Sequence, residues 1–220
     1  MEAVMEDIRE QTAQAEATVT TEIPVAGGIG YIVAKRLFDI VVAFVAGILC
    51  LIPMGVIAIM IRLDSKGDAI FKQERLGKNG KPFTMYKFRT MVQNAEANGP
   101  QWADPNDRRC TKLGRMLRNT RLDELPQLWN ILMGDMSFVG PRPERGYFYN
   151  EFEKYIPGFR NRLLVKPGLT GLAQINGGYE LRPEEKLVYD MEYIAKRSIW
   201  LDLSCIFRTV KLIFTHEGAR

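Results

Sequence analysis

An uncharged apolar segment near the N-terminal end constrains this chain most. Residues Ile40 to Ile61 are 22 consecutive positions without a charged side chain, flanked by Lys35-Arg36 and Arg62. A helix of that length measures about 33 Å and would cross a hydrocarbon core of roughly 30 Å. The segment is too long and too deep in the chain for a signal peptide. A buried helix of a soluble protein is the weaker alternative, so we predict a membrane-bound protein.

Pro53 interrupts this segment and leaves its topology open. It divides the segment into arms of 14 and 8 residues, neither of which crosses a bilayer alone. Because both flanks are basic, the enrichment of Lys and Arg on the cytoplasmic side does not choose an orientation. A re-entrant hairpin would keep both ends on one face, whereas a proline-kinked span would separate them. Spacing alone slightly favours the span.

Charge is distributed unevenly along the chain. Residues 1–30 carry six acidic side chains and one basic one, a net charge of −5. The rest carries 29 basic and 20 acidic side chains, a net charge of +9, which suits anionic lipid headgroups or a phosphorylated ligand. The acidic tail has little apolar periodicity, so it is expected to be mobile or weakly helical.

Several kinds of chemistry are excluded by the residues available. The only histidine is His216, which nearly rules out histidine-based triads and metal sites. Three widely spaced cysteines, Cys50, Cys110 and Cys205, form no metal pattern and indicate a reducing compartment. Nucleic-acid binding is not expected, because no groove-reading motif or zinc spacing is present. Any catalysis must therefore depend on carboxylates, Arg and Lys.

Two adjacent carboxylates, Asp123 and Glu124, are the strongest candidates for such chemistry. Thr120 and Asp123 have the spacing of a helix capping pair, and Pro126 fits a first helical turn. The helix dipole and free backbone N–H groups would keep both acids ionised beside a natural phosphate site. Such a carboxylate serves as nucleophile, metal ligand or base. Plain helix capping is the simpler alternative.

The remaining pattern predicts a mostly helical body with one β-hairpin. Strands are expected at residues 69–75 and 82–90 around an Asn-Gly turn, and helices at 111–118, 123–133, 183–196 and 200–214. Gly140-Pro141-Arg142-Pro143 predicts a rigid extended loop, and residues 166–171 a turn-rich one. The last helix has an apolar stripe for which core packing is preferred over the headgroup boundary: Trp200, Leu203, Phe207, Val210 and Phe214.

Five motifs in one order give the sequence a resemblance to a known family. They are Lys35-Arg36-Leu37-Phe38-Asp39-Ile40, Met85-Tyr86-Lys87-Phe88-Arg89-Thr90-Met91, Leu122-Asp123-Glu124-Leu125-Pro126-Gln127-Leu128, Gly134-Asp135-Met136-Ser137-Phe138-Val139-Gly140-Pro141-Arg142-Pro143 and Lys166-Pro167-Gly168-Leu169-Thr170-Gly171-Leu172-Ala173-Gln174-Ile175-Asn176-Gly177. Together they resemble the bacterial sugar transferase family, the monotopic polyprenyl-phosphate phosphoglycosyl transferases. The resemblance runs from about Tyr31 to Phe214.

This resemblance implies an architecture and an activity. The fold would be mostly α with one β-hairpin: an acidic tail (1–30), a re-entrant membrane helix (31–63), and a cytosolic catalytic domain (64–220) with amphipathic interfacial helices. Family members move a sugar-1-phosphate from a UDP-sugar to polyprenyl (undecaprenyl) phosphate and release UMP. The reaction takes place at the cytoplasmic face of the bacterial inner membrane. It is the first membrane step in the assembly of a surface glycan, such as an exopolysaccharide, capsule or glycoconjugate.

The resemblance also assigns roles to individual residues. Asp123 matches the nucleophile that forms a covalent phosphosugar intermediate, and Glu124 matches the glutamate associated with Mg²⁺. Four further residues match substrate- or phosphate-binding positions: Lys87, Arg118, Arg142 and Asp190. A surface charge is the alternative role for Lys87 and Arg118, and a structural partner of a nearby cation is the alternative for Asp190.

The chain departs from the family pattern at three places. Ile52 precedes Pro53 where relatives often have a small polar residue, Asn176-Gly177-Gly178 replaces Asn-Gly-Arg, and Glu144-Arg145-Gly146 replaces an apolar continuation. The last two departures are expected to affect sugar choice. A non-catalytic membrane scaffold and a metal-dependent diphosphatase are the competing functions, but a scaffold has no need of the acidic pair. The sugar and the formation of a homo-oligomer are left open.

Overall fold

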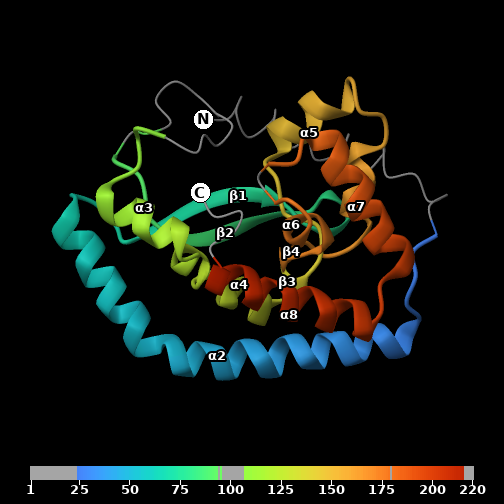
Figure 1. The fold of residues 1–220 in the computed structure, drawn as a ribbon, viewed down its shortest axis with the longest axis horizontal. Helices are drawn as coiled ribbons and strands as arrows, with labels where there is room; N and C mark the ends of the chain where they lie inside the picture. The colour runs from blue at the N-terminus through green and yellow to red at the C-terminus, as the bar shows by residue number, and fades with distance from the viewer. Residues whose placement is uncertain (1–23, 94, 96–106, 179, 216–220) are drawn as a thin grey trace.

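The computed structural model describes residues 24–93, 95, 107–178 and 180–215, so most of the predicted acidic tail lies outside the described residues. The described residues form a mostly helical body with four short strands in two sheets. A long helix, α2 (Ile29–Asp64), runs along the lower edge of the molecule in Figure 1, and the other elements lie above it. This arrangement places the body on one side of the apolar helix.

The apolar segment forms one continuous helix that bends part-way along (Figure 1). Pro53 lies inside it, and a proline there removes a backbone hydrogen bond and clashes with the preceding turn. The most apolar 18-residue window of α2 is only 11% buried, so α2 is not a buried core helix. By length and composition it is able to cross a membrane. Four of its residues are buried against the body: Asp39, Ala43, Ile57 and Ile61.

Both flanks of α2 are attached to the same body. Before the helix, the backbone N–H of Ala26 donates to the carbonyl of Ile194 at 3.0 Å. After it, the guanidinium of Arg89 donates to the carbonyls of Ser65 and Lys66 at 2.7 and 2.6 Å. The two ends of the apolar helix therefore lie on the side that the body occupies.

The predicted β-hairpin is confirmed. Strands β1 (Ile70–Leu76) and β2 (Pro82–Phe88) are antiparallel, with Ile70 opposite Phe88 and Leu76 opposite Pro82. A short 3-10 turn, η1 (Lys78–Gly80), connects them. Asn79 and Gly80 both have φ in the left-handed region, at 57° and 74°. Asn and Gly tolerate that conformation best, which explains the hairpin signal in the sequence.

A second small sheet was not predicted. Strand β3 (Ser137–Val139) pairs in parallel with β4 (Gly168–Thr170), inside the segment expected to be only a loop. A Cβ atom added to Gly168 would lie 2.1 Å from the backbone nitrogen of Gly140, so this close pairing requires glycine. The fold class is thus mostly α with a hairpin, as predicted, plus this parallel pair.

Three predicted helices agree with the structure. Helix α3 (Lys112–Asn119) begins after Thr111, whose hydroxyl accepts a hydrogen bond from the N–H of Gly114 at 2.9 Å. Helices α7 (Pro183–Lys196) and α8 (Ile199–Thr215) follow their apolar periodicity. Shorter elements were missed: α5 (Gly146–Glu153), the 3-10 helix η3 (Phe159–Leu164) and α6 (Leu172–Ile175).

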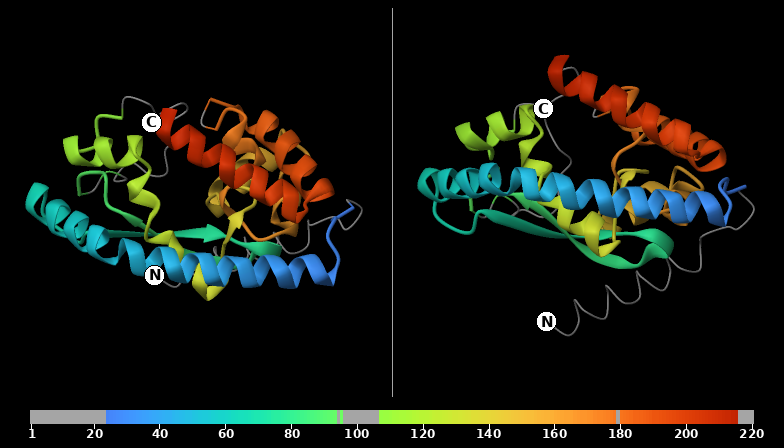
Figure 2. Two further views of the ribbon diagram at one scale, coloured as in Figure 1. Left: turned by 60° about the horizontal axis from the view of Figure 1, so that its bottom comes forward. Right: turned by 90° about the horizontal axis from the view of Figure 1, so that it is seen from below.

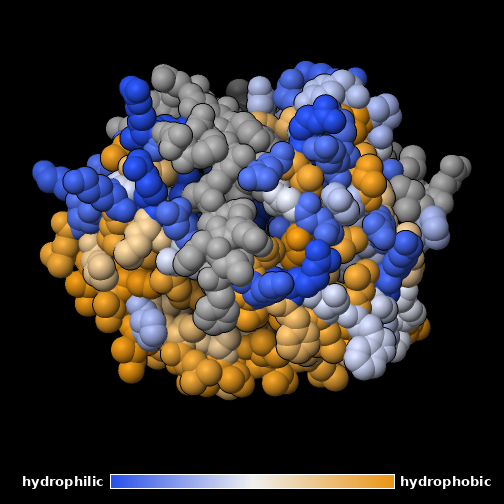
Figure 3. Space-filling view, in the orientation of Figure 1, coloured by the Kyte–Doolittle hydropathy of each residue, from blue (hydrophilic) through white to orange (hydrophobic). Residues whose placement is uncertain are grey.

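The prediction that the apolar stripe of α8 packs into the core was wrong. Trp200 and Phe207 are 81% and 70% exposed, and Val210 is also exposed, while Asp202 and Cys205 are buried. The side chain of the last predicted stripe residue, at position 214, lies outside the described ones. Figure 2 shows α8 beside the N-terminal part of α2, and Figure 3 shows hydrophobic residues gathered along the edge that α2 forms.

Two hydrophobic cores of the body include residues of α2. Ala43 packs into a cluster formed with β2 and with helix α4 (Gln127–Met133): Met85, Leu128, Ile131 and Met136. Ile57 and Ile61 pack into a second cluster below the hairpin and α3: Ala69, Phe88 and Leu117. The arms on either side of Pro53 therefore each bury side chains against the body.

Candidate active site

The acidic pair lies in a 3-10 turn, η2 (Leu122–Glu124), and not in the first turn of an α-helix. Helix α4 starts only at Gln127, with Pro126 as its N-cap. Thr120 closes the preceding helix instead, because its hydroxyl donates to the carbonyl of Met116 at 2.9 Å. The predicted capping pair and the predicted helix start were therefore wrong. Other groups must stabilise the two carboxylates.

Glu124 is held by two cations. The Arg142 guanidinium donates to Glu124 Oε1 at 2.5 Å, and the Lys87 ammonium donates to the same oxygen at 3.1 Å. Glu124 is 8% exposed, and burial by itself raises its pKa. Arg142 and Lys87 outweigh burial and hold the pKa of Glu124 well below its ordinary range. Glu124 is therefore a fixed negative charge with two fixed positive neighbours.

Asp123 has a different electrostatic environment. It is 7% exposed, and burial raises its pKa above the ordinary value. The Lys87 charge lowers the pKa of Asp123, the neighbouring Glu124 raises it, and Arg142 lowers it, without cancelling the effect of burial. The expected helix end is absent here, so burial and the neighbouring charges, and not a helix dipole, set the direction of the Asp123 pKa. A partly desolvated carboxylate beside cations is poorly hydrated, which favours reactivity toward phosphorus.

The two cations come from different elements. Lys87 lies on β2, and Arg142 lies in the loop that follows β3. The carbonyl of Arg142 accepts a hydrogen bond from Arg162 at 3.0 Å, and the carbonyl of Pro143 accepts one from Arg75 at 3.1 Å. Two arginines therefore fix the backbone of the loop that presents Arg142 to Glu124.

Asp190 lies behind this loop. It is fully buried, and its Oδ2 accepts a hydrogen bond from Arg162 Nε at 2.7 Å. Burial raises the pKa of Asp190 although the Arg162 charge lowers it. Because Arg162 in turn donates to the Arg142 carbonyl, two arginines link Asp190 to Glu124. These contacts match the alternative role, in which Asp190 is a structural partner of a cation.

Arg118 approaches the acidic pair from α3. Its Nε donates to the hydroxyl of Thr90 at 3.1 Å, and its charge lowers the pKa of Asp123. Helix α3 lies very close to the segment that follows β2, since a Cβ atom added to Gly114 would lie 1.9 Å from the Thr90 carbonyl oxygen. Arg118 is therefore placed to act on charge near Asp123.

Two residues that position the site were not predicted. The side-chain amide of Asn130 donates to the carbonyl of Thr84 at 2.7 Å and accepts from the N–H of Tyr86 at 3.1 Å, which ties α4 to the edge of β2. Arg36 on α2 donates to two carbonyls at the end of α4, at 2.6 and 2.7 Å. Each of these contacts joins segments that lie 44 to 96 positions apart, so no local pattern in the sequence signals them.

The carboxylates of the acidic pair fit one kind of Mg²⁺ site, in which a bound substrate supplies further ligands. Among the described residues, no group of three or more His, Cys, Asp or Glu side chains forms a metal cluster. Mg²⁺ is usually bound by one or two carboxylates together with substrate phosphates and waters. Glu124 supplies one such carboxylate, whose Oε1 already accepts from Arg142 and Lys87. The site therefore fits an ion completed by a phosphorylated substrate and waters, and not a preformed protein cage.

Comparison with known proteins identifies the family. A sequence model of the family described as bacterial sugar transferase matches residues 30–216, which include α2, the acidic pair and the Arg142 loop. The chain belongs to the bacterial sugar transferase family. The match covers every element from α2 to α8, so this family membership applies to the whole fold that the structure describes.

Individual relatives of this bacterial sugar transferase carry more specific names. The chain is 42% identical over 193 residues to a UDP-N-acetylgalactosamine-undecaprenyl-phosphate N-acetylgalactosaminephosphotransferase of Aeromonas hydrophila, covering 86% of the chain and 46% of that protein. It is 44% identical over 192 residues to a UDP-glucose:undecaprenyl-phosphate glucose-1-phosphate transferase of Klebsiella pneumoniae, covering 85% and 41%. A Caulobacter vibrioides protein of the latter name is 39% identical over 190 residues, covering 84% and 71%. The chain thus spans less than half the length of the first two relatives.

Proposed function

We propose that this chain is an enzyme that transfers a sugar-1-phosphate from a UDP-sugar to polyprenyl (undecaprenyl) phosphate and releases UMP. The observation that carries the proposal is Glu124, clamped by Arg142 and Lys87 next to the buried Asp123. The names of the relatives, which specify undecaprenyl phosphate and two different sugars, support it. The reaction would be the first membrane step of surface-glycan assembly.

In the first step, a carboxylate oxygen of Asp123 attacks the β-phosphorus of the UDP-sugar. A bond forms between Asp123 and that phosphorus, and the bond from the phosphorus to the bridging oxygen breaks, so UMP leaves with the bridging oxygen. Negative charge grows on the phosphoryl oxygens and on UMP. Arg142, Lys87 and Arg118 supply fixed positive charge beside Asp123, which is the main requirement of phosphoryl transfer.

In the second step, a phosphate oxygen of the polyprenyl phosphate attacks the same phosphorus. The bond between Asp123 and phosphorus breaks, the carboxylate is restored, and a polyprenyl diphosphate sugar is released. The covalent intermediate allows UMP to leave before the lipid phosphate arrives, so two bulky anions need not share one site. Mg²⁺ held by Glu124 and substrate phosphate oxygens would add positive charge at the reacting phosphoryl group.

We also propose that α2 is re-entrant and that the body lies on the cytoplasmic face of the bacterial inner membrane. The hydrogen bonds of Ala26 and Arg89 attach both flanks of α2 to one body, whereas an ordinary span would place those flanks on opposite faces of a hydrocarbon core of roughly 30 Å. The exposed apolar side chains of α8, including Trp200 and Phe207, would lie in the headgroup boundary. This placement puts the acidic pair near the depth of a lipid phosphate.

The mechanism is tested by Asp123→Asn, assayed for UMP release and for a phosphosugar adduct by intact-protein mass spectrometry. The variant should lose both, while Asp68→Asn, a control carboxylate whose side chain is 91% exposed, should retain both. Full activity of Asp123→Asn would contradict the nucleophile assignment. Repeated turnover of UDP-sugar without polyprenyl phosphate would instead indicate the diphosphatase. A panel of UDP-sugars in the same assay identifies the sugar.

Topology is tested with single cysteines introduced at positions 25 and 66 and an impermeant maleimide. Both positions should be labelled in inside-out membrane vesicles and protected in intact cells. Labelling of the two positions from opposite sides would mean that α2 is an ordinary span.

A further inference from the structure

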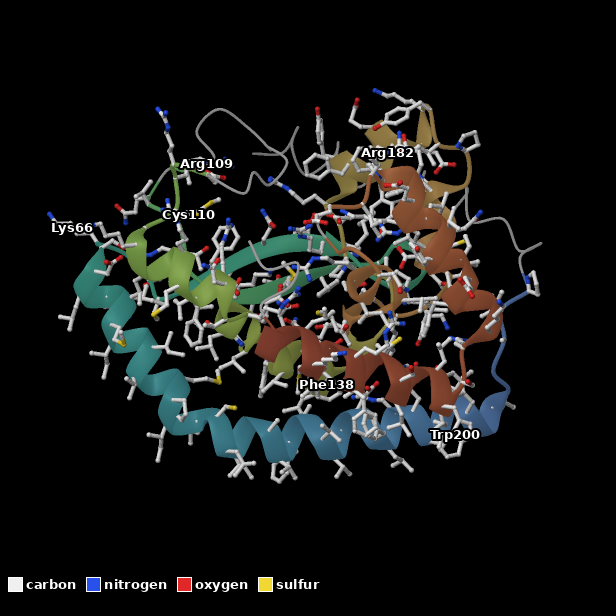
Figure 4. The ribbon with its side chains drawn as sticks, viewed as in Figure 1. Lys66, Arg109, Cys110, Phe138, Arg182 and Trp200 are labelled. Atoms are coloured by element: carbon white, nitrogen blue, oxygen red, sulfur yellow. The ribbon has the colours of Figure 1, made fainter. Side chains whose placement is uncertain are left out.

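A cavity of about 250 Å³ lies between the N-terminal half of α2, strand β3 and the start of α8. Its apolar lining comes from all three elements: Ala34, Phe38, Phe138, Val139, Ile199 and Leu203. Figure 4 shows Phe138 between α2 and α8, and Trp200 at the outer edge of the same region. None of these side chains has a role in the proposed chemistry.

The polar side chains at the cavity wall are occupied by the protein. Asp202 accepts hydrogen bonds from Lys35 at 2.8 Å and from the Tyr31 hydroxyl at 2.9 Å. Asp39 accepts from the hydroxyl of Ser137 and from the N–H of Phe138, both at 3.1 Å. A bound water needs two to four polar partners, and an apolar cavity without them stays dry or takes an apolar ligand. The cavity is therefore suited to hydrocarbon.

The cavity borders the apolar surface of the molecule. Val33 and Leu37, on the neighbouring positions of α2, are 52% and 59% exposed, and Trp200 is exposed beside Ile199. A hydrocarbon chain that lies in the membrane against α2 and α8 would reach the cavity laterally without crossing water. This continuity identifies a membrane lipid, and not a soluble metabolite, as the kind of molecule that enters.

The cavity also lies next to the loop that presents Arg142 to the acidic pair. Val139 lines it, and Arg142 follows three residues later, so their Cα atoms are at most about 11 Å apart. Arg142 contacts Glu124 at 2.5 Å. The cations at the acidic pair attract a phosphate, and an uncharged lipid offers them nothing. A phosphorylated lipid would satisfy the charged site and the cavity at once.

We propose that this cavity binds the isoprene units nearest the phosphate of the polyprenyl acceptor. An apolar cavity of about 150 Å³ holds the six carbons of benzene, so 250 Å³ holds about ten carbons, or two isoprene units. The inference rests on the proposed function, because it assigns the tail of the same acceptor. It predicts a contribution to acceptor binding and none to attack on the UDP-sugar.

The two half-reactions separate this inference from the proposed function. Ala34→Phe fills the cavity, and Val33→Phe adds the same ring one residue away on the exposed side of α2. With UDP-sugar alone, both variants should give the wild-type burst of UMP. With polyprenyl phosphate, Ala34→Phe should raise KM for the acceptor by at least about tenfold, because displacing only two buried methylene groups already costs roughly that factor. Val33→Phe should leave that KM within about twofold of wild type.

A second cavity variant and a binding measurement keep the test independent of activity. Leu203→Phe narrows the cavity from α8 and should reproduce the KM change, which guards against misfolding of Ala34→Phe. A polyprenyl phosphate with a diazirine in its first isoprene units should cross-link to Phe138 or Leu203, and unlabelled acceptor should compete. An unchanged KM in both folded variants, cross-linking elsewhere, or equal competition by ordinary phospholipid would overturn the assignment. A wild-type chain that cross-links in the cavity but gives no UMP burst would support the cavity and contradict the proposed function.

Discussion

Replacing Asp190 tests whether this residue touches substrate or only supports the Arg142 loop. The Asp190 and Arg162 side chains are each 1% exposed and 2.7 Å apart. Asp190→Asn leaves the Arg162 charge buried without its counter-charge, which typically costs about 3–5 kcal/mol. For a chain of this size each kcal/mol lowers Tm by about 2–4 °C, so Tm should fall by about 6–20 °C. Thermal unfolding of the detergent-solubilised protein measures it.

The matched control removes both members of the pair. Arg162→Met with Asp190→Leu fills the same space without charge, and such replacements of buried pairs are often neutral in stability. The double variant should therefore recover most of the lost Tm. The reasoning is refuted if Asp190→Asn keeps Tm within about 2 °C of wild type while KM for the UDP-sugar rises tenfold, because that combination indicates a substrate contact.

Three further outcomes are expected. Lys87→Met removes the largest charge that lowers the Asp123 pKa, so the acid limb of the UMP-burst rate against pH should move to higher pH; an unmoved or lower midpoint would contradict Asp123 as the group that must lose a proton. Glu124→Gln should raise the Mg²⁺ concentration for half-maximal activity or abolish activity, and an unchanged metal titration would exclude a ligand role. Asn130→Leu leaves two backbone groups of β2 without partners and should cost about 2 kcal/mol or more, measured as a fall in Tm.

Elements with strong local signals were predictable from the sequence. The Asn-Gly turn and the Pro183 helix start each rely on a few neighbouring residues, and both appear as expected. The β3–β4 pair was not predictable, because three-residue strands that pair across about 30 positions leave no periodic pattern. The stripe of α8 was misassigned because apolar periodicity marks a hydrophobic face without saying whether protein or lipid covers it.

The candidate site shows the same division. Residue chemistry selected Asp123 and Glu124, motif resemblance added Lys87 and Arg142, and the structure brings the last three into direct contact. Local reasoning about Thr120 and the helix dipole failed, since the burial that raises the pKa of Asp123 depends on tertiary packing. The relay from Asp190 through Arg162 to the Arg142 carbonyl joins distant segments, so no spacing in the sequence could reveal it.

The packing of α2 has a consequence for how the protein can be divided. Ala43 completes the cluster around Ile131, and Ile57 and Ile61 complete the cluster around Leu117. A truncated chain starting after Asp64 would expose both clusters to water and would also lose the Arg36 contacts that close α4. Deleting the apolar helix should therefore give an aggregating fragment and not a soluble catalytic domain. The helix that we propose to lie in the membrane is therefore also part of the hydrophobic core of the body that carries the acidic pair.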